Sequence, residues 1–280
     1  MQPKEVGSMT SLFCCPICGQ PLEREERSYV CPKRHCYDIA KEGYVNLLPA
    51  NKKHAKDPGD DRDMVAARTR FLEGGHYAPL REALSGLILE KEPEAVLDSG
   101  CGEGWYTAGI CTALRENGVN ARVAGVDLSR SALKKAARRT GEAEFAVASV
   151  YHLPVADHTA DVLLNCFSPL APEEFRRVLT PGGAFLYVVP GAKHLWELKR
   201  VLYENSYENQ EEESVYSGFS YERIVPVDFT MELDAPALQS LFWMTPYCWK
   251  TPKAGIERLN VLKGLSVTAS FRVHMFRADG

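Results

Sequence analysis

The chain has 280 residues, of which 45% are hydrophobic, and its formal net charge at pH 7 is −4. This length accommodates one full α/β domain and a smaller unit, and the negative charge excludes a uniformly basic nucleic-acid-binding protein, so any RNA contact must come from a local patch. No run approaches the roughly 20 apolar residues of a membrane helix, and residues 1–10 lack the order of a signal peptide, so we expect a cytoplasmic protein.

Residues 1–50 are expected to form a small zinc-binding module. Five of the nine cysteines lie within residues 14–36. Four potential ligands have the spacing Cys-x2-Cys-x12-Cys-x3-His: Cys15, Cys18, Cys31 and His35. Each pair lies on a tight turn, so the four can bind one Zn2+ tetrahedrally, and such a closed site is structural because no position remains for water. Cys14 and Cys36 flank this set and could replace a ligand, and two unrelated thiol pairs in a reducing cytoplasm are the alternative.

Residues 51–92 are expected to connect this module to a catalytic domain. Residues 51–63 are polar and contain a Pro-Gly pair, which is typical of a linker. Apolar residues at helical spacing predict helices over residues 64–73 and 79–89, separated by a turn that contains Gly74 and Gly75.

The best local basic patch lies in this connection. It combines a run in the linker with two arginines on the next helix: Lys52, Lys53, His54, Lys56, Arg68 and Arg70. We expect these side chains to bind RNA phosphates because the run joins the two units. A solvated loop, with a helix face paired to nearby acids, is the alternative interpretation.

Residues 93–280 alternate short apolar runs with helical segments. Predicted strands cover residues 95–97, 122–126, 144–147, 161–166 and 184–189. Predicted helices cover residues 105–116, 129–140, 172–179 and 194–203. Strands that alternate with crossover helices form a parallel, doubly wound sheet, so the predicted fold class is α/β and Rossmann-like. Residues 221–231 and 265–276 also have β character and enclose a helix near 235–242, which predicts a hairpin-like pair that closes one sheet edge.

The clearest motif of this domain is a glycine-rich turn after its first strand. Asp98, Gly100, Gly102 and Gly104 follow an apolar strand and precede a helix that begins near Trp105. Glycines here let the backbone come close to a ligand at the carboxyl end of the strand. The third glycine comes one residue too early for a dinucleotide-binding fingerprint. The order Asp-x-Gly-x-Gly-x-Gly instead resembles the first motif of class I S-adenosylmethionine methyltransferases, in which the acid lies close to the methionine portion of the cofactor.

A second acid supports this interpretation. Asp127 ends the next strand, where a carboxylate can accept hydrogen bonds from both hydroxyls of a ribose. Residues 153–157 resemble the segment that these enzymes place beside the adenine. A glycine-rich turn with a helix-capping Asp is the alternative, but strand, turn and second acid together favour a cofactor site.

Asn165 follows the fourth strand, where enzymes that methylate exocyclic amines usually carry Asn/Asp-Pro-Pro-Tyr/Phe. The sequence here is Asn-Cys-Phe-Ser-Pro, which departs from that pattern and favours methylation of a ring atom, whose proton must be removed. Asn165 either contacts the substrate or simply caps the strand.

Taken together, these motifs resemble the RlmA-type family of bacterial 23S rRNA (guanine-N1-)-methyltransferases nearly end to end. Besides the zinc-ligand spacing and the cofactor turn, the matching segments are residues 38–48, 57–60, 67–77, 190–195 and 244–246. One departure is Trp105, which replaces a Tyr often found at that position.

The resemblance implies an S-adenosylmethionine methyltransferase domain over residues 93–280 and an RNA-recognition role for the zinc module. It further implies methylation at N1 of one guanine in a domain II hairpin near the peptide exit tunnel, and a homodimer whose modules line an RNA-binding cleft. The cofactor contacts that it adds are Tyr77, Tyr106, Thr107 and His194.

Transfer to guanine N1 requires that its proton leaves as the methyl group arrives. Asn165 and His194 are the catalytic candidates, and we assign His194 to cofactor contact before proton transfer. We expect a splayed-out target base stacked on an aromatic side chain. The candidates are Phe167, Trp243, Tyr247 and Trp249, and we expect at least three of these to be core residues instead.

Two other functions stay open at this point. A small-molecule methyltransferase would leave the zinc module unexplained. A non-catalytic RNA-binding or resistance protein would have no reason to keep Asp98, Gly100, Gly102 and Asp127 together.

Overall fold

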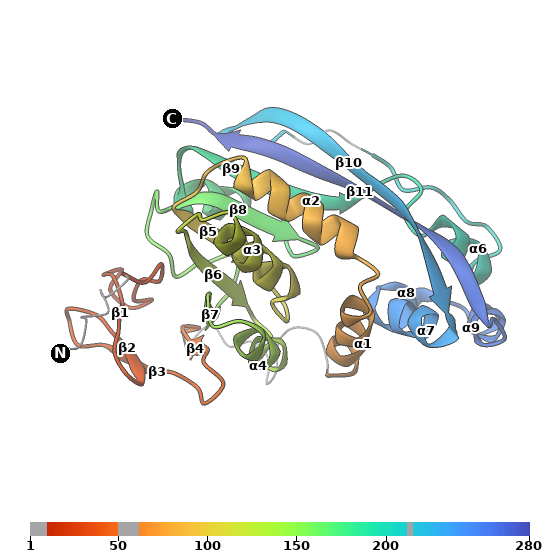
Figure 1. Cartoon of the computed structure of the whole chain (residues 1–280), viewed down its shortest axis with the longest axis horizontal. Coiled ribbons are helices and arrows are strands. Elements are labelled where there is room, and N and C mark those ends of the chain that lie inside the picture. The colour runs from red at the N-terminus through yellow and green to blue at the C-terminus, as the bar shows by residue number, and fades with distance from the viewer. Residues whose placement is uncertain (1–9, 50–61, 212–214) are drawn as a thin grey trace.

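The computed structural model describes residues 10–49, 62–211 and 215–280. Its centre is an eight-stranded sheet with the order β10-β11-β9-β8-β5-β6-β7-β4 (Figure 1). The parallel strands at its centre are β5 (Ala95–Ser99), β6 (Arg122–Asp127), β7 (Glu144–Val147), β8 (Ala160–Cys166) and β9 (Leu179–Pro190). This is the doubly wound α/β sheet that the sequence predicts.

Helices cover both faces of the sheet. Those before or between the parallel strands are α1 (Arg62–Glu73), α2 (Ala78–Leu89), α3 (Trp105–Glu116), α4 (Arg130–Arg139) and α5 (Pro172–Val178). Those in the C-terminal part are α6 (Trp196–Leu202), α7 (Ala235–Met244), α8 (Tyr247–Lys250) and α9 (Lys253–Asn260). The short helices α8 and α9 were not expected from the sequence, because their apolar periodicity spans too few turns. No helix in the described ranges is both long and apolar enough to span a membrane.

The predicted C-terminal pair of strands is confirmed. β10 (Phe219–Asp234) and β11 (Gly264–Ala278) are antiparallel to each other, and β11 also pairs antiparallel with β9. Phe276 of β11 packs against the rings of Phe185 at 5.5 Å and Tyr221 at 4.5 Å between centroids. This aromatic contact fixes the pair to the parallel part of the sheet.

The N-terminal residues form a small sheet of three strands, β1 (Glu23–Arg24), β2 (Ser28–Val30) and β3 (Cys36–Asp38). The segment is also tied to the large sheet, because β4 (Val45–Asn46) pairs in parallel with β7. Glu144 of β7 accepts hydrogen bonds from the Leu12 N–H at 3.0 Å and the Tyr29 hydroxyl at 2.8 Å. The N-terminal segment therefore packs against the sheet edge, at the opposite end of the molecule from α6 to α9 (Figure 1).

All five parallel strands end at the same edge of the sheet. Asp98 lies one residue before the end of β5, and Asp127 and Cys166 are the last residues of β6 and β8. Ligands of open α/β sheets bind outside the carboxyl ends of the strands. The residues at this edge are therefore the place to look for a site.

Candidate functional site

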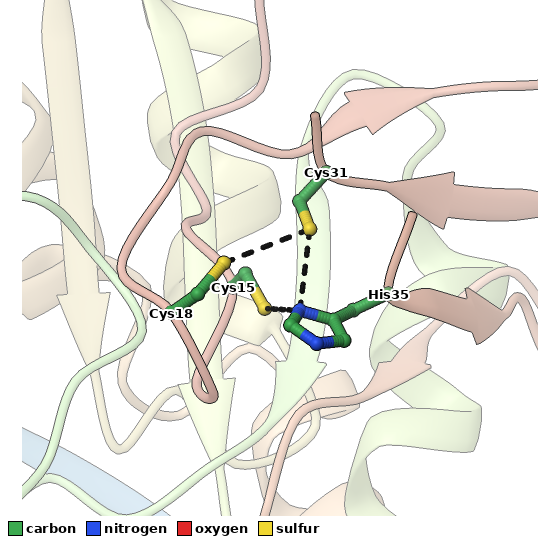
Figure 2. A group of neighbouring side chains, drawn as sticks. All are labelled: Cys15, Cys18, Cys31 and His35. Atoms are coloured by element: carbon green, nitrogen blue, oxygen red, sulfur yellow. Dashed lines mark hydrogen bonds between the residues drawn. The ribbon is translucent and has the colours of Figure 1, made fainter. Parts of the chain in front are cut away.

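The four predicted metal ligands lie together in the N-terminal segment (Figure 2). Their ligand atoms all lie within 4.8 Å of one another. The His35 Nδ1 atom lies 3.4 Å from the Sγ atoms of both Cys15 and Cys31, and the Cys18 and Cys31 sulfurs are 3.7 Å apart. A tetrahedral Zn2+ with bonds of about 2.0–2.3 Å has edges of roughly 3.3–3.8 Å. The spacing fits that ion, and the flanking Cys14 and Cys36 are not part of the cluster.

Two tight turns hold these ligands. The Gly19 N–H donates to the Cys15 carbonyl at 2.8 Å with a φ of 69°, and the Arg34 N–H donates to the Cys31 carbonyl at 2.7 Å with a φ of 66°. Burial opposes ionisation of the Cys15 thiol, but hydrogen bonds from the Tyr37 hydroxyl, at 3.0 Å, and from the backbone lower its pKa to about 6. The thiolate form that binds metal is thus favoured before a metal arrives.

The second feature is the turn between β5 and α3, where Gly100, Gly102 and Gly104 have φ values of 82°, 54° and 69°. A Cβ atom on Gly100 would lie 2.2 Å from Cβ of Ser168, and one on Gly104 would lie 2.8 Å from Cβ of Ala136. Around Gly102 only Arg68 approaches within 4 Å among the described residues. Gly100 and Gly104 are therefore required because a side chain there would clash with its neighbours. At Gly102 the backbone instead stays open toward the carboxyl edge of the sheet.

Asp98 lies buried beside this turn. Its Oδ2 accepts a hydrogen bond from the Thr107 hydroxyl at 2.6 Å. Burial, reinforced by the nearby Asp127 carboxylate and opposed by the Thr107 hydrogen bond, raises the pKa of Asp98 to about 7. A cation bound beside this carboxyl would favour its ionised form, so the site suits a cationic partner.

Asp127 connects the end of β6 to the same turn. Its Oδ2 accepts a hydrogen bond from the Gly102 N–H at 2.9 Å, and its Oδ1 accepts one from the Ser129 N–H at 2.7 Å. The side chain is half-buried, so part of it faces the sheet edge. The structure therefore brings both predicted acids to one turn.

Four buried polar atoms at this edge have no hydrogen-bond partner among the described residues: Ser99 Oγ, Glu103 Oε1, Tyr106 Oη and Asn165 Oδ1. The closest charged group to Glu103 Oε1 is Arg139 Nη2 at 3.7 Å, which is too long for a hydrogen bond. Buried polar groups are nearly always paired, so orphans gathered at one edge indicate a ligand site. A cofactor that carries hydroxyl, amino and carboxylate groups matches this mixture of donors and acceptors.

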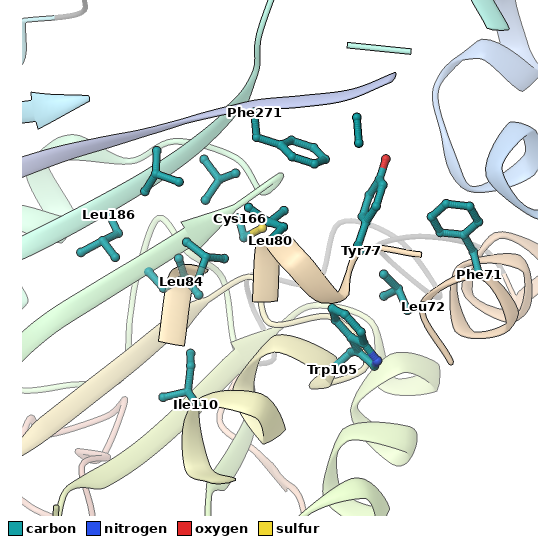
Figure 3. Close-up of a cluster of buried hydrophobic side chains, with 14 of the residues drawn as sticks. Phe71, Leu72, Tyr77, Leu80, Leu84, Trp105, Ile110, Cys166, Leu186 and Phe271 are labelled. Atoms are coloured by element: carbon teal, nitrogen blue, oxygen red, sulfur yellow. The ribbon is translucent and has the colours of Figure 1, made fainter. Parts of the chain in front are cut away.

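Aromatic rings cluster where the start of α2 meets β11. The Tyr77 ring lies between those of Phe71 and Phe271, at centroid distances of 5.0 and 5.1 Å (Figure 3). His194 lies 4.6 Å from Phe271, and its Nδ1 accepts a hydrogen bond from the Ser270 N–H at 3.2 Å. Burial, assisted by the charge of Lys199, lowers the pKa of His194 to about 3. The imidazole is therefore neutral, with its proton on Nε2, where it can only donate.

Residues at the end of β8 and directly after it close the other side of the turn. The Asn165 amide donates to Ser168 Oγ at 2.7 Å, and the Ser168 hydroxyl donates to the Ser99 carbonyl at 2.6 Å. Phe167 has a left-handed φ of 57° and is 49% exposed. The sequence analysis did not identify Ser168 as a site residue. Its position after a parallel strand was the available signal, because it places Ser168 at the same edge as Gly100.

The expectation that at least three of the four aromatic candidates are core residues is wrong. Phe167, Trp243 and Trp249 are 49%, 47% and 67% exposed, and only Tyr247 is half-buried. The two tryptophans lie on α7 and α8, whose short amphipathic patterns gave no reliable inward face. Trp105 is buried and stacks under the Arg81 guanidinium, which lies 4.2 Å from its ring centroid.

The basic patch expected before the catalytic domain is only partly described. Lys52, Lys53, His54 and Lys56 lie outside the described residues. Arg68 of α1 lies beside the glycine turn, with its Nη1 atom 3.8 Å from a Cβ built on Gly102. Arg70 donates to the Ser240 hydroxyl at 3.4 Å. The two arginines therefore have different neighbours. The sequence spacing alone could not predict that Arg68 lies beside Gly102.

Comparisons with known proteins agree with both parts of this site. Residues 13–56 match a zinc-ribbon family model described as "RlmA, N-terminal", and residues 96–183 match one described as "Methyltransferase domain". The chain is 36% identical to a 23S rRNA (guanine(748)-N(1))-methyltransferase of Streptomyces fradiae, over 90% of this chain and 91% of the relative. It is 33% identical to a putative 23S rRNA (guanine-N(1)-)-methyltransferase of Bacillus subtilis, over 92% of this chain and 94% of the relative. A putative 23S rRNA (guanine-N(1)-)-methyltransferase of Micromonospora griseorubida is 40% identical, over 66% of this chain and 67% of the relative.

The ligand cluster predicts one structural Zn2+ per chain. Cys31→Ser removes a thiolate and should reduce the zinc content, measured by inductively coupled plasma mass spectrometry after dialysis, from about one ion to well below one. Cys36→Ser is the matched control, because this exposed thiol lies outside the cluster, and it should retain the ion. Equal zinc content in the two variants would contradict the assignment.

Proposed function

Because the chain belongs to the RlmA-type 23S rRNA (guanine-N1-)-methyltransferase family, it is an S-adenosylmethionine-dependent rRNA methyltransferase, and we propose that its target is N1 of one guanine in a domain II hairpin near the peptide exit tunnel. The observation that supports this proposal best is the pair of acids around the glycine turn, with orphaned buried polar atoms beside them. The name of the Streptomyces fradiae relative specifies N1 of guanine 748, which supports a guanine N1 target in 23S rRNA.

We propose eight residues as cofactor contacts: Tyr77, Asp98, Gly100, Gly102, Tyr106, Thr107, Asp127 and His194. When bound, the cofactor supplies a methyl group activated by its sulfonium. Asp98, oriented by the Thr107 hydroxyl, lies where the methionine portion is expected, and Asp127 is placed to accept hydrogen bonds from a ribose. The aromatic cluster of Tyr77, His194 and Phe271 would exclude water from the cofactor.

The catalytic candidates take different proposed roles. His194 has its Nδ1 occupied and its pKa lowered to about 3, so it acts as a hydrogen-bond donor and not as the base that removes the guanine N1 proton. Asn165 presents an unpaired Oδ1, which suits it to accept a hydrogen bond from an N–H group. Both side chains would position reactants and would not exchange protons with them.

We propose Phe167 as the residue that stacks on the splayed-out guanine. Its exposed ring follows β8 directly and lies next to Ser168, which contacts the glycine turn. A non-glycine residue with a left-handed φ is uncommon and concentrates at functional sites. Base stacking on aromatic rings is the usual way in which proteins hold an unpaired base.

The larger organisation is proposed on the family resemblance. Residues 1–50 would form the zinc-binding RNA-recognition module, residues 51–92 the connection and residues 93–280 the methyltransferase domain. The chain would act as a homodimer whose modules line an RNA-binding cleft. A ribosomal RNA substrate supports a cytoplasmic location.

The target is tested by transfer of labelled methyl groups from S-adenosylmethionine to unmodified 23S rRNA. The modified position is then mapped by reverse transcription, because an N1-methyl group blocks Watson–Crick pairing. We expect one strong stop, within the domain II hairpin, that is absent when Asp127→Ala replaces the wild-type chain. Cofactor binding without label in RNA would instead favour a small-molecule acceptor.

The raised pKa of Asp98 predicts pH-dependent cofactor binding. A cationic ligand favours the ionised carboxylate, so binding below pH 7 must release a proton, and the affinity should rise about tenfold per pH unit until it levels off near pH 7. Isothermal titration calorimetry between pH 5.5 and 8 measures this. Asp98→Asn should bind weakly without this pH dependence, whereas Asp279→Asn, which changes an exposed carboxylate outside the proposed site, should behave as wild type. A wild-type affinity that is constant over the range would count against the role of Asp98.

A further inference from the structure

We infer that the outward face of α4, formed by Arg130, Lys134 and Arg138, binds the phosphate backbone of the RNA substrate. This inference rests on the proposed function and adds to it a surface that the sequence analysis did not identify. α4 has the sequence RSALKKAARR, with five cationic residues and no acidic residue. In a chain of net charge −4, this concentration of positive charge in ten residues is local and requires an explanation.

The five cations fall into two rows with different environments. Lys135 and Arg139 face α1, where the Lys135 ammonium donates to Thr69 Oγ1 at 2.7 Å and Arg139 pairs with Glu73 at 3.1 Å. Arg139 also donates to the Glu103 carbonyl at 3.3 Å, next to the glycine turn. This inner row therefore holds α4 in place.

The outer row is spaced for contact with a partner outside the chain. Arg130, Lys134 and Arg138 are four residues apart and so lie along one helix face, at intervals of about 6 Å. Lys134 and Arg138 are exposed and Arg130 is half-buried. Within the described ranges, Arg130 and Lys134 have no ion pair, and Arg138 pairs only with Glu42, at 3.2 Å, while its side chain stays 68% exposed. Such a pair is worth little and is easily exchanged for a phosphate.

The position of this row connects the two functional parts of the molecule. α4 follows Asp127 and Ser129 directly, so Arg130 lies beside the carboxyl edge where the cofactor site is proposed. Farther along, Leu133 and Ala136 pack with Tyr44, and a Cβ on Gly43 would lie 3.6 Å from that of Ala137. The helix that carries the outer row, α4, lies between the N-terminal segment and α1 (Figure 1).

Phosphate fits this surface better than other anions. A polynucleotide offers one charge per nucleotide along a continuous line, which matches cations repeated along a helix. An acidic protein surface would need apolar or hydrogen-bonding partners near the row, and the buried Leu133 and Ala136 are already covered. Each of three phosphate contacts should contribute about 0.7 to 0.9 to the slope of log affinity against log salt concentration.

The test compares RNA binding of the full-length wild-type chain and the triple variant Arg130→Ala, Lys134→Ala, Arg138→Ala. Alanine keeps the helix intact at exposed positions. The probe is an unmodified transcript of the domain II hairpin, followed by fluorescence anisotropy between 50 and 200 mM KCl. The salt slope of the variant should be smaller by about 2.1 to 2.7, so that wild-type affinity falls about 20- to 40-fold more than that of the variant across this range. Cofactor affinity should be unchanged.

The charge-matched control is Lys263→Ala, Arg223→Ala, Arg277→Ala. These exposed residues lie on or directly before β10 and β11, at the opposite edge of the sheet from β7 and β4, and their loss should leave the slope within about 0.5 of wild type. If the triple α4 variant does not fold, the single Lys134→Ala variant should still reduce the slope by about 0.7 to 0.9. A wild-type slope in the α4 variants, or an equal loss in the control, would overturn the inference. Neither result depends on which nucleotide is methylated, whereas absence of methylation by the wild-type chain would count against the proposed target.

Discussion

The left-handed turn of Gly100, Gly102 and Gly104 is the constraint on which the rest of the site depends. Because these residues lack side chains, the chain reverses directly after β5, and the first turn of α3 brings the Thr107 hydroxyl to Asp98. Ser168 can then approach Gly100 from β8, and the Gly102 N–H can reach Asp127 at the end of β6. Three neighbouring strand ends are thereby held around one space, and any side chain at Gly100 would displace Ser168.

Burial then gives this space its electrostatic character. Asp98 is removed from water and lies near a second carboxylate, so its pKa is raised to about 7. Burial also disfavours the charged form of His194, and together with the charge of Lys199 it keeps the imidazole neutral. The N-terminal segment joins this sheet from the side, because β4 pairs with β7 and Tyr44 shares a hydrophobic cluster with Leu133 and Ala136 of α4. Metal ligands, cofactor turn and the cationic row of α4 are thus parts of one continuous structure.

The sequence predicted those features whose geometry is encoded locally. The zinc ligands could be identified because two short turns bring each pair together, and Asp98 and Asp127 because carboxyl ends of parallel strands share an edge. The position of Arg68 beside Gly102 and the pairing of β4 with β7 could not be predicted, since both depend on contacts between segments far apart in the chain. The exposure of Trp243 and Trp249 was missed because α7 and α8 are too short for a clear periodic pattern.

The most direct test of this account compares cofactor binding by Gly100→Ala and Gly118→Ala. Both glycines have a positive φ, of 82° and 70°, so both substitutions carry a similar backbone cost of about 1–2 kcal/mol. Only at Gly100 would the new Cβ meet Ser168, because nothing lies within 4 Å of Gly118 among the described residues. Calorimetry with S-adenosylmethionine, alongside urea unfolding to confirm that both variants fold, should show wild-type affinity for Gly118→Ala and a loss of at least about tenfold for Gly100→Ala. A folded Gly100→Ala variant that binds the cofactor as tightly as wild type would contradict the central role of the turn.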